Sequence, residues 1–267
     1  ILSGIIDGVS SPVALIGVAE KGYLSIQLSA EAAGGHSSIP PTQTAIGVLS
    51  RALQRIEAAP FPAKLEGPTR RMFDYLGPEM SWEKRLALAN LWLFEPLIRT
   101  QLSASHLTNA IIRTTLAPTI FSAGVKENIL PSHASAVVNL RIMPGETTTG
   151  ALEHLRKAID DPAIKLTPRP LRMEPSAVSD SESPSFNLLQ RTIREVAPKT
   201  IVAPSLLVAA TDSRHFAALT KNIFRFLPIT VKAEDTKRYH GIDERIFIED
   251  YARCVRFYAQ LIRNSSP

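Results

Sequence analysis

The stretch YLSIQLSA, residues 23–30, alternates strictly between an apolar and a polar set of side chains. Successive side chains of a β-strand point to opposite faces of a sheet, so this period of two predicts a strand with one buried face. The expected buried positions are Leu24, Ile26, Leu28 and Ala30. Residues 136–142 alternate in the same way, and they predict a second half-buried strand that ends at Pro144-Gly145.

Two helices and two further strands complete this pattern. Apolar residues recur at helical spacing over residues 45–56, and Thr42 or Thr44 can cap that helix. The other expected elements are a helix over residues 149–160 and short strands around Ile120 and over residues 164–167. The order strand, helix, strand, strand, helix, strand predicts a ferredoxin-like (βαββαβ) unit with both helices on one face of an antiparallel sheet.

The rest of the chain predicts part of a larger α/β unit. After an expected Pro-rich turn over residues 168–175, helical and strand patterns alternate. The expected elements are a helix over 186–193, a strand over 201–208, a helix, a strand over 223–227, a loop and a final helix from Ile248. Residues 1–19 and 175–267 are assigned to this unit, and residues 20–174 to the ferredoxin-like domain, with a mostly helical insertion at 60–112.

The composition of the chain argues against several classes of protein and of site. The chain has 267 residues and a net charge of +5, but its basic residues come as isolated pairs with acidic neighbours, so nucleic-acid binding is not expected. No apolar run reaches the roughly 18 residues of a membrane span. A single cysteine, Cys254, excludes an internal disulfide and a Cys-based zinc cluster. The sequence gives no basis for assigning a compartment.

Two of the six histidines stand in contexts that suit chemistry. His36 follows the paired glycines of GGHSS, where it can offer an N–H to developing negative charge or simply cap the next helix. His240 lies in a loop between a strand and the final helix, a place where open α/β sheets bind ligands. One histidine makes no metal site, and no His-x-x-x-His or Cys-x-x-Cys spacing occurs.

Five motifs in order carry a family resemblance. They are GGHSS (34–38), ENILP (127–131), NLRIMPG (139–145), TDSRHF (211–216) and YHGIDER (239–245). Together they resemble the M20 family of zinc metallopeptidases, and most of all its carboxypeptidase S type, which includes N-acyl amino acid hydrolases. The resemblance implies a catalytic α/β domain interrupted by a ferredoxin-like lid domain that also forms a homodimer.

The resemblance also implies a role for individual residues. His240 corresponds to the last of the ligands that hold two zinc ions, whereas the other ligands and the glutamate base would precede Ile1, so whether this chain alone binds zinc stays open. His36 would stabilise the reaction intermediate in the partner subunit. The implied substrate-binding residues are Asn128, Arg141, Thr211 and Arg214.

Two hypotheses about function stay open. The first is a zinc-dependent hydrolase that cleaves the amide bond before a C-terminal amino acid, in a peptide or an N-acyl amino acid, by metal-activated water. The alternative is a truncated, non-catalytic dimerisation or binding module of such an enzyme. From the residues alone, Arg141 could instead pair with a surface carboxylate, and Arg214 could bind Asp212.

Overall fold

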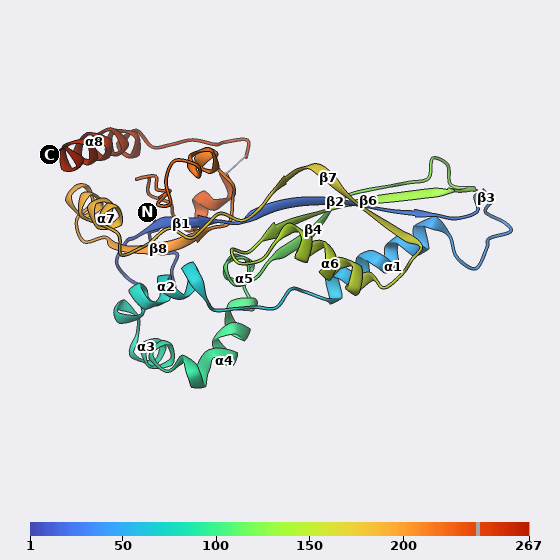
Figure 1. The fold of residues 1–267 in the computed structure, drawn as a ribbon, viewed down its shortest axis with the longest axis horizontal. Helices are drawn as coiled ribbons and strands as arrows, with labels where there is room; N and C mark the ends of the chain where they lie inside the picture. The colour runs from blue at the N-terminus through green and yellow to red at the C-terminus, as the bar shows by residue number, and fades with distance from the viewer. Residues whose placement is uncertain (239–240, 267) are drawn as a thin grey trace.

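The computed structural model describes residues 1–238 and 241–266, and in it the chain is elongated (Figure 1). A four-stranded sheet with two helices forms one end, and a two-stranded sheet surrounded by helices forms the other. Within the described residues, no helix has the length and apolar character that crossing a membrane requires.

The four-stranded sheet has the predicted ferredoxin-like topology. Its strands β2 (Gly22–Glu31), β4 (Thr115–Ala123), β6 (His133–Ile142) and β7 (Ile164–Met173) lie in the order β4-β6-β2-β7, and every neighbouring pair is antiparallel. Helices α1 (Ala45–Ala58) and α6 (Thr148–Ile159) cover the same face. The predicted α/β class and the ferredoxin-like order are therefore confirmed, and we call this unit the lid.

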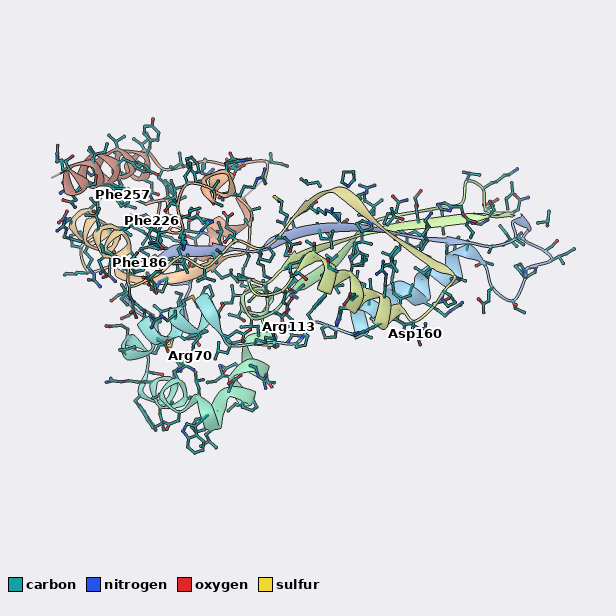
Figure 2. The ribbon with its side chains drawn as sticks, in the orientation of Figure 1. Arg70, Arg113, Asp160, Phe186, Phe226 and Phe257 are labelled. Atoms are coloured by element: carbon teal, nitrogen blue, oxygen red, sulfur yellow. The ribbon has the colours of Figure 1, made fainter. Side chains whose placement is uncertain are left out.

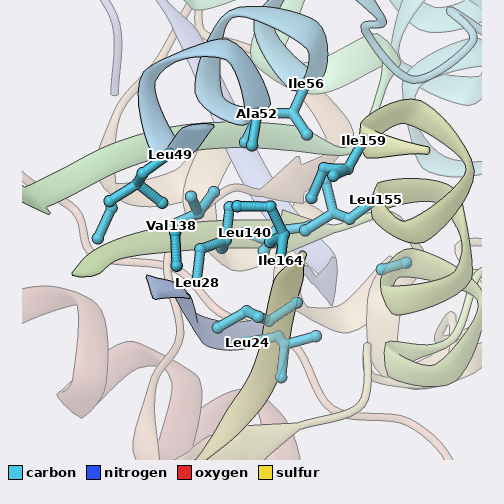
Figure 3. Close-up of a cluster of buried hydrophobic side chains, with 14 of the residues drawn as sticks. Leu24, Leu28, Leu49, Ala52, Ile56, Val138, Leu140, Leu155, Ile159 and Ile164 are labelled. Carbon is cyan, nitrogen blue, oxygen red and sulfur yellow. The ribbon is translucent and has the colours of Figure 1, made fainter. Parts of the chain in front are cut away.

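The alternating residues of β2 and β6 form the core of the lid. Leu24, Leu28 and Leu140 are fully buried between the sheet and the two helices (Figure 3). Burying each such side chain contributes roughly 1.5–3 kcal/mol. Thr44 caps α1, because its side chain accepts a hydrogen bond from the Gly47 amide at 3.1 Å.

The expected Pro-rich turn after residue 167 is wrong. Strand β7 continues through Pro168 and Pro170 to Met173. Proline lacks the amide hydrogen that a central strand needs, but β7 is an edge strand and pairs only with β2, so the prolines are tolerated. A register shift opposite Leu24 and Ile26 accommodates them.

The insertion is helical, as predicted, and it packs on the second sheet. It consists of α2 (Gly67–Leu76), the 3₁₀ helix η1 (Gly77–Glu79), α3 (Trp82–Ala89), α4 (Leu91–Ser103) and α5 (His106–Ile112). Met72 and Leu76 of α2 pack against Val13 and Ala203 of the second sheet. The insertion thus connects the lid to the other end of the molecule.

In the second sheet, β1 (Val13–Glu20) runs parallel to β8 (Ile201–Leu207). Helix α2 covers one face. Helices α7 (Pro184–Val196) and α8 (Ile248–Ser265) cover the other, where Ile16, Phe186 and Phe257 form the core. Helix α7, strand β8 and helix α8 were predicted, although the apolar stripe of α8, which includes Tyr251 and Ile262, is exposed in this chain.

Two predictions for residues 208–228 are wrong. The expected helix is only the short 3₁₀ helix η2 (Asp212–Phe216), and the expected strand is a single bridge between Gly17 and Arg225. The reason is that separate segments share the outer edge of β1. Leu2 pairs with Val13, and the Ser179 amide donates to the Val18 carbonyl at 2.8 Å, so no single strand can extend along that edge. A further 3₁₀ helix, η3 (Ala233–Arg238), follows.

Candidate functional site

The structure brings His36 and Asn128 together at the tip of the lid. The short strand β3 (Gly35–His36) pairs with β5 (Ile129–Leu130), and the Ser37 amide donates to the Asn128 carbonyl at 3.2 Å. Gly34 permits this approach, since a Cβ there would lie only 3.0 Å from the Leu130 carbonyl oxygen. The tip is therefore built by the GGHSS and ENILP motifs together.

Hydrogen bonds define the tautomer of neutral His36. The Ser38 backbone amide, which can only donate, donates to His36 Nδ1 at 3.2 Å, and Ser38 Oγ lies 2.8 Å from the same nitrogen. Nδ1 is thus the acceptor, and the proton of the neutral ring belongs on Nε2. Because the side chain is exposed, Nε2–H is available to an oxygen of a ligand.

Arg141 and Arg214 approach a second region, where the lid meets the two-stranded sheet. The Arg141 guanidinium lies over the Tyr23 ring, 4.8 Å from its centroid. Tyr23 pairs with Met173 at the end of β7, and Arg214 Nη1 contacts Met173 Sδ. We call this region, where residues 20–22 pass from β1 to β2, the junction.

Neither arginine has the alternative partner that the sequence suggested. Among the residues that the structure describes, no carboxylate lies within ion-pair distance of Arg141. Arg214 contacts Met173 and not Asp212. The guanidinium of Arg141 therefore stands on an aromatic face, where a cation–π contact holds it while its N–H donors can meet a carboxylate.

The hydroxyl of Thr211 is occupied within the chain. It donates to Glu20 at the end of β1 and accepts from the Ser213 amide at 3.2 Å, which caps η2. Glu20 also forms an ion pair with Arg225. Sequence reasoning missed Glu20 and Arg225. The only signal was a charged pair, Glu20-Lys21, at the end of an otherwise apolar strand.

Lys21 is a buried amine at the junction, and sequence reasoning missed it too. Its side chain is 2% exposed, and Nζ donates to the Arg113 carbonyl at 2.7 Å. Arg113 lies where the insertion returns to the lid sheet (Figure 2). Burial is the main reason that the pKa of Lys21 falls to about 7; Glu146 opposes the shift, and the nearby charge of Arg141 adds to it.

A zinc site cannot be built from the described residues. His240, the predicted ligand, lies outside them. In residues 1–238 and 241–266, no group of three or more His, Cys, Asp and Glu side chains could hold a metal ion. A zinc centre needs several convergent ligands, so any such site would draw on further residues. His154, by contrast, is structural: it stacks on Phe61 and lies 2.9 Å from the Ala59 carbonyl.

Comparison with known protein families and sequences gives consistent matches. The model of the M20 peptidase dimerisation domain matches residues 18–167. A probable carboxypeptidase S-like protein of Dictyostelium discoideum is 44% identical over 99% of this chain and 51% of its own length. An N-fatty-acyl-amino acid synthase/hydrolase of Xenopus tropicalis is 42% identical over 99% of this chain and 52% of its own length. The chain spans about half the length of the relatives that it matches.

Solved structures share the fold at low sequence identity. An M20 family metallo-carboxypeptidase from Sulfolobus solfataricus aligns with a TM-score of 0.62 at 15% identity, covering 94% of this chain and 60% of that one. Human carnosine dipeptidase 1 aligns with the same TM-score of 0.62 at 11% identity, covering 97% of this chain and 57% of that one. The arrangement of the lid and the second sheet thus recurs in these proteins.

Proposed function

This chain belongs to the M20 family of peptidases, whose dimerisation domain matches residues 18–167, and on that premise we propose that it is part of a zinc-dependent hydrolase. The enzyme would cleave the amide bond before a C-terminal amino acid, in a peptide or an N-acyl amino acid. The relatives named carboxypeptidase S-like protein and N-fatty-acyl-amino acid synthase/hydrolase support this substrate class.

One observation carries the proposal: the candidate residues fall into two groups at opposite ends of the lid. His36 and Asn128 lie at the tip, whereas Arg141, Thr211 and Arg214 lie at or beside the junction. The two ends of one lid cannot meet (Figure 1). A site that contains both groups therefore needs the tip residues of a second copy of the chain. A homodimer formed through the lid would provide them.

The side chains of this chain have separate tasks in the proposed reaction. The planar guanidinium of Arg141 would bind the terminal carboxylate of the substrate and thereby orient the amide bond. His36, from the partner copy, would donate from Nε2–H to the oxygen on which negative charge develops. Zinc, when bound in the whole enzyme, would supply an activated water.

The test uses residues 1–267 expressed together with their natural upstream coding sequence. With zinc present, we expect cleavage of short peptides or N-acyl amino acids, and we expect His240→Ala to lower both activity and zinc content. Absence of cleavage, together with an unchanged zinc content in His240→Ala, would contradict the proposal. Lys165→Met, a change at an exposed site on β7, is the control for the effect of substitution itself.

A second candidate function is a non-catalytic dimerisation module. It is favoured by the lack of a metal-ligand cluster among the residues that the structure describes. Metal analysis of the purified 267-residue chain separates the two. The module predicts a dimer with almost no zinc, and near-stoichiometric zinc would rule it out.

A further inference from the structure

A buried ion pair holds the segment that follows β8. Arg225 Nε lies 3.1 Å from Glu20 Oε1, and the two side chains are only 8% and 5% exposed. Glu20 accepts a hydrogen bond from the Thr211 hydroxyl, and Arg225 Nε donates to Ser213 Oγ at 2.9 Å. Each member of the pair therefore binds one residue of the segment 209–214, which we call the TDSR loop.

Arg225 is itself fixed to β1 by its backbone. Its amide and carbonyl exchange hydrogen bonds with Gly17, at 3.0 and 2.8 Å. A Cβ at position 17 would lie 3.2 Å from the Cβ of Arg225, so this close approach suits glycine. Arg225 Nη1 also donates to the Ile223 carbonyl at 2.8 Å. The ion pair is thus part of a rigid frame at the end of β1.

Besides the bonds to Glu20 and Arg225, the side chains of the TDSR loop make one further polar contact with the rest of the described chain, between Arg214 and Met173. Thr211, Asp212 and Arg214 are exposed, and η2 is a single short 3₁₀ helix. Removing two charges from water is costly, and a buried ion pair often gives no more stability than apolar residues of the same volume. The Glu20–Arg225 pair is buried despite this cost, and its hydrogen bonds go to one loop. Fixing the position of that loop therefore explains the pair better than added stability does.

We propose that Glu20 and Arg225 are positioning residues for the TDSR loop. Their ion pair sets the place of Arg214, which contacts Met173 beside the proposed site for the substrate carboxylate. The inference rests on the proposed function, and it assigns to that site two residues that touch no substrate themselves. Loss of the pair should weaken recognition of the carboxylate more than it slows the chemical step.

The first experiment needs no catalytic activity. Hydrogen exchange of the backbone amides of residues 209–217, followed by mass spectrometry, is compared between the wild-type chain and Glu20→Gln. We expect exchange in Glu20→Gln to be at least about tenfold faster, since the loop loses its frame. Unchanged exchange in this segment would overturn the proposal.

The matched control is another partly buried ion pair. On α8, Arg253 Nη1 lies 2.6 Å from Asp250 Oδ1, and Asp250 Oδ1 also accepts a hydrogen bond from the Thr230 amide at 3.1 Å. Asp250→Asn should speed exchange around Thr230 and leave residues 209–217 as they are. If both variants speed exchange in residues 209–217 equally, the effect is general loosening, and the proposed role of Glu20 fails.

The second experiment measures kinetics in the protein expressed with its upstream sequence. Glu20→Gln should raise KM for an N-acyl amino acid about tenfold while kcat changes less than about threefold. The KM for the same substrate with a carboxamide in place of its carboxylate should not change. Equal effects on both substrates, or no effect on either, would contradict positioning for carboxylate recognition.

A double variant separates position from stability. Glu20→Gln combined with Arg225→Met removes both charges, so thermal stability should return toward that of the wild type. KM for the carboxylate substrate should stay raised, and a KM that recovers in step with stability would overturn the proposal. If the wild-type protein cleaves nothing, the proposed function fails, and the exchange result alone decides whether the pair positions the loop.

Discussion

At the scale of single residues, the junction is held by charged groups that a sequence pattern does not reveal. Glu20, Lys21 and Arg225 meet there through contacts between residues far apart in the chain. The alternation of β2 predicts which of its side chains are buried, but it carries no information about what lies against the end of β1. The motifs did identify Arg141 and His36 as candidates, and their roles stay predictions.

Lys21 predicts a measurable pH dependence of folding. Its pKa is about 7 in the folded chain, against an ordinary value of 10.5. Below pH 7 the amine is protonated in both states, so the full cost of burying its charge is present. Between pH 7 and 10.5 only the unfolded state carries the extra proton, so the free energy of unfolding rises with pH, by up to about 1.4 kcal/mol per unit.

The variant Lys21→Met isolates this effect. Its free energy of unfolding, minus that of the wild type, should fall as pH rises from 7 to 10, as measured by chemical denaturation at each pH. The exposed Lys165, changed to Met, is the control for the loss of a lysine at a solvent-exposed site. A flat difference for Lys21→Met would show that its amine is not buried as described.

At the scale of elements, the lid could be predicted because its signals are local. Alternation fixed the buried faces of β2 and β6, and helical spacing fixed α1 and α6. Residues 208–228 could not be predicted, since the bridge at Arg225 depends on which segments share the edge of β1. The extension of β7 through Pro168 was missed because its position at the sheet edge is a property of the tertiary fold.

The core of the lid predicts a large loss of stability on truncation. Leu140 is fully buried on the central strand β6, so Leu140→Ala should lower the free energy of unfolding by about 2–5 kcal/mol. Leu171 on the edge strand β7 is 58% exposed, and Leu171→Ala should change the free energy of unfolding by less than about 0.5 kcal/mol. Urea denaturation of both variants measures the contrast, and equal losses would place the core elsewhere.

At the scale of the whole molecule, the proposed function depends on the length of the lid. The tip that carries His36 and the junction that carries Arg141 are separated by the long axis of the four-stranded sheet (Figure 1). Such a shape suits a dimer in which each lid reaches the other copy. The boundaries assigned at residues 19–20 and 174–175 stay predictions, and the helical insertion shows that the two units are also joined by packing on β1 and β8.

Complementation between two inactive variants tests the shared site most directly. His36→Ala and Arg141→Ala are each expressed with the natural upstream sequence and are expected to lose most of their activity. When mixed dimers form, one site in each combines the intact tip of one copy with the intact junction of the other. Random pairing predicts recovery of about a quarter of wild-type activity. Activity no higher than that of the two separate variants would contradict a site shared between copies.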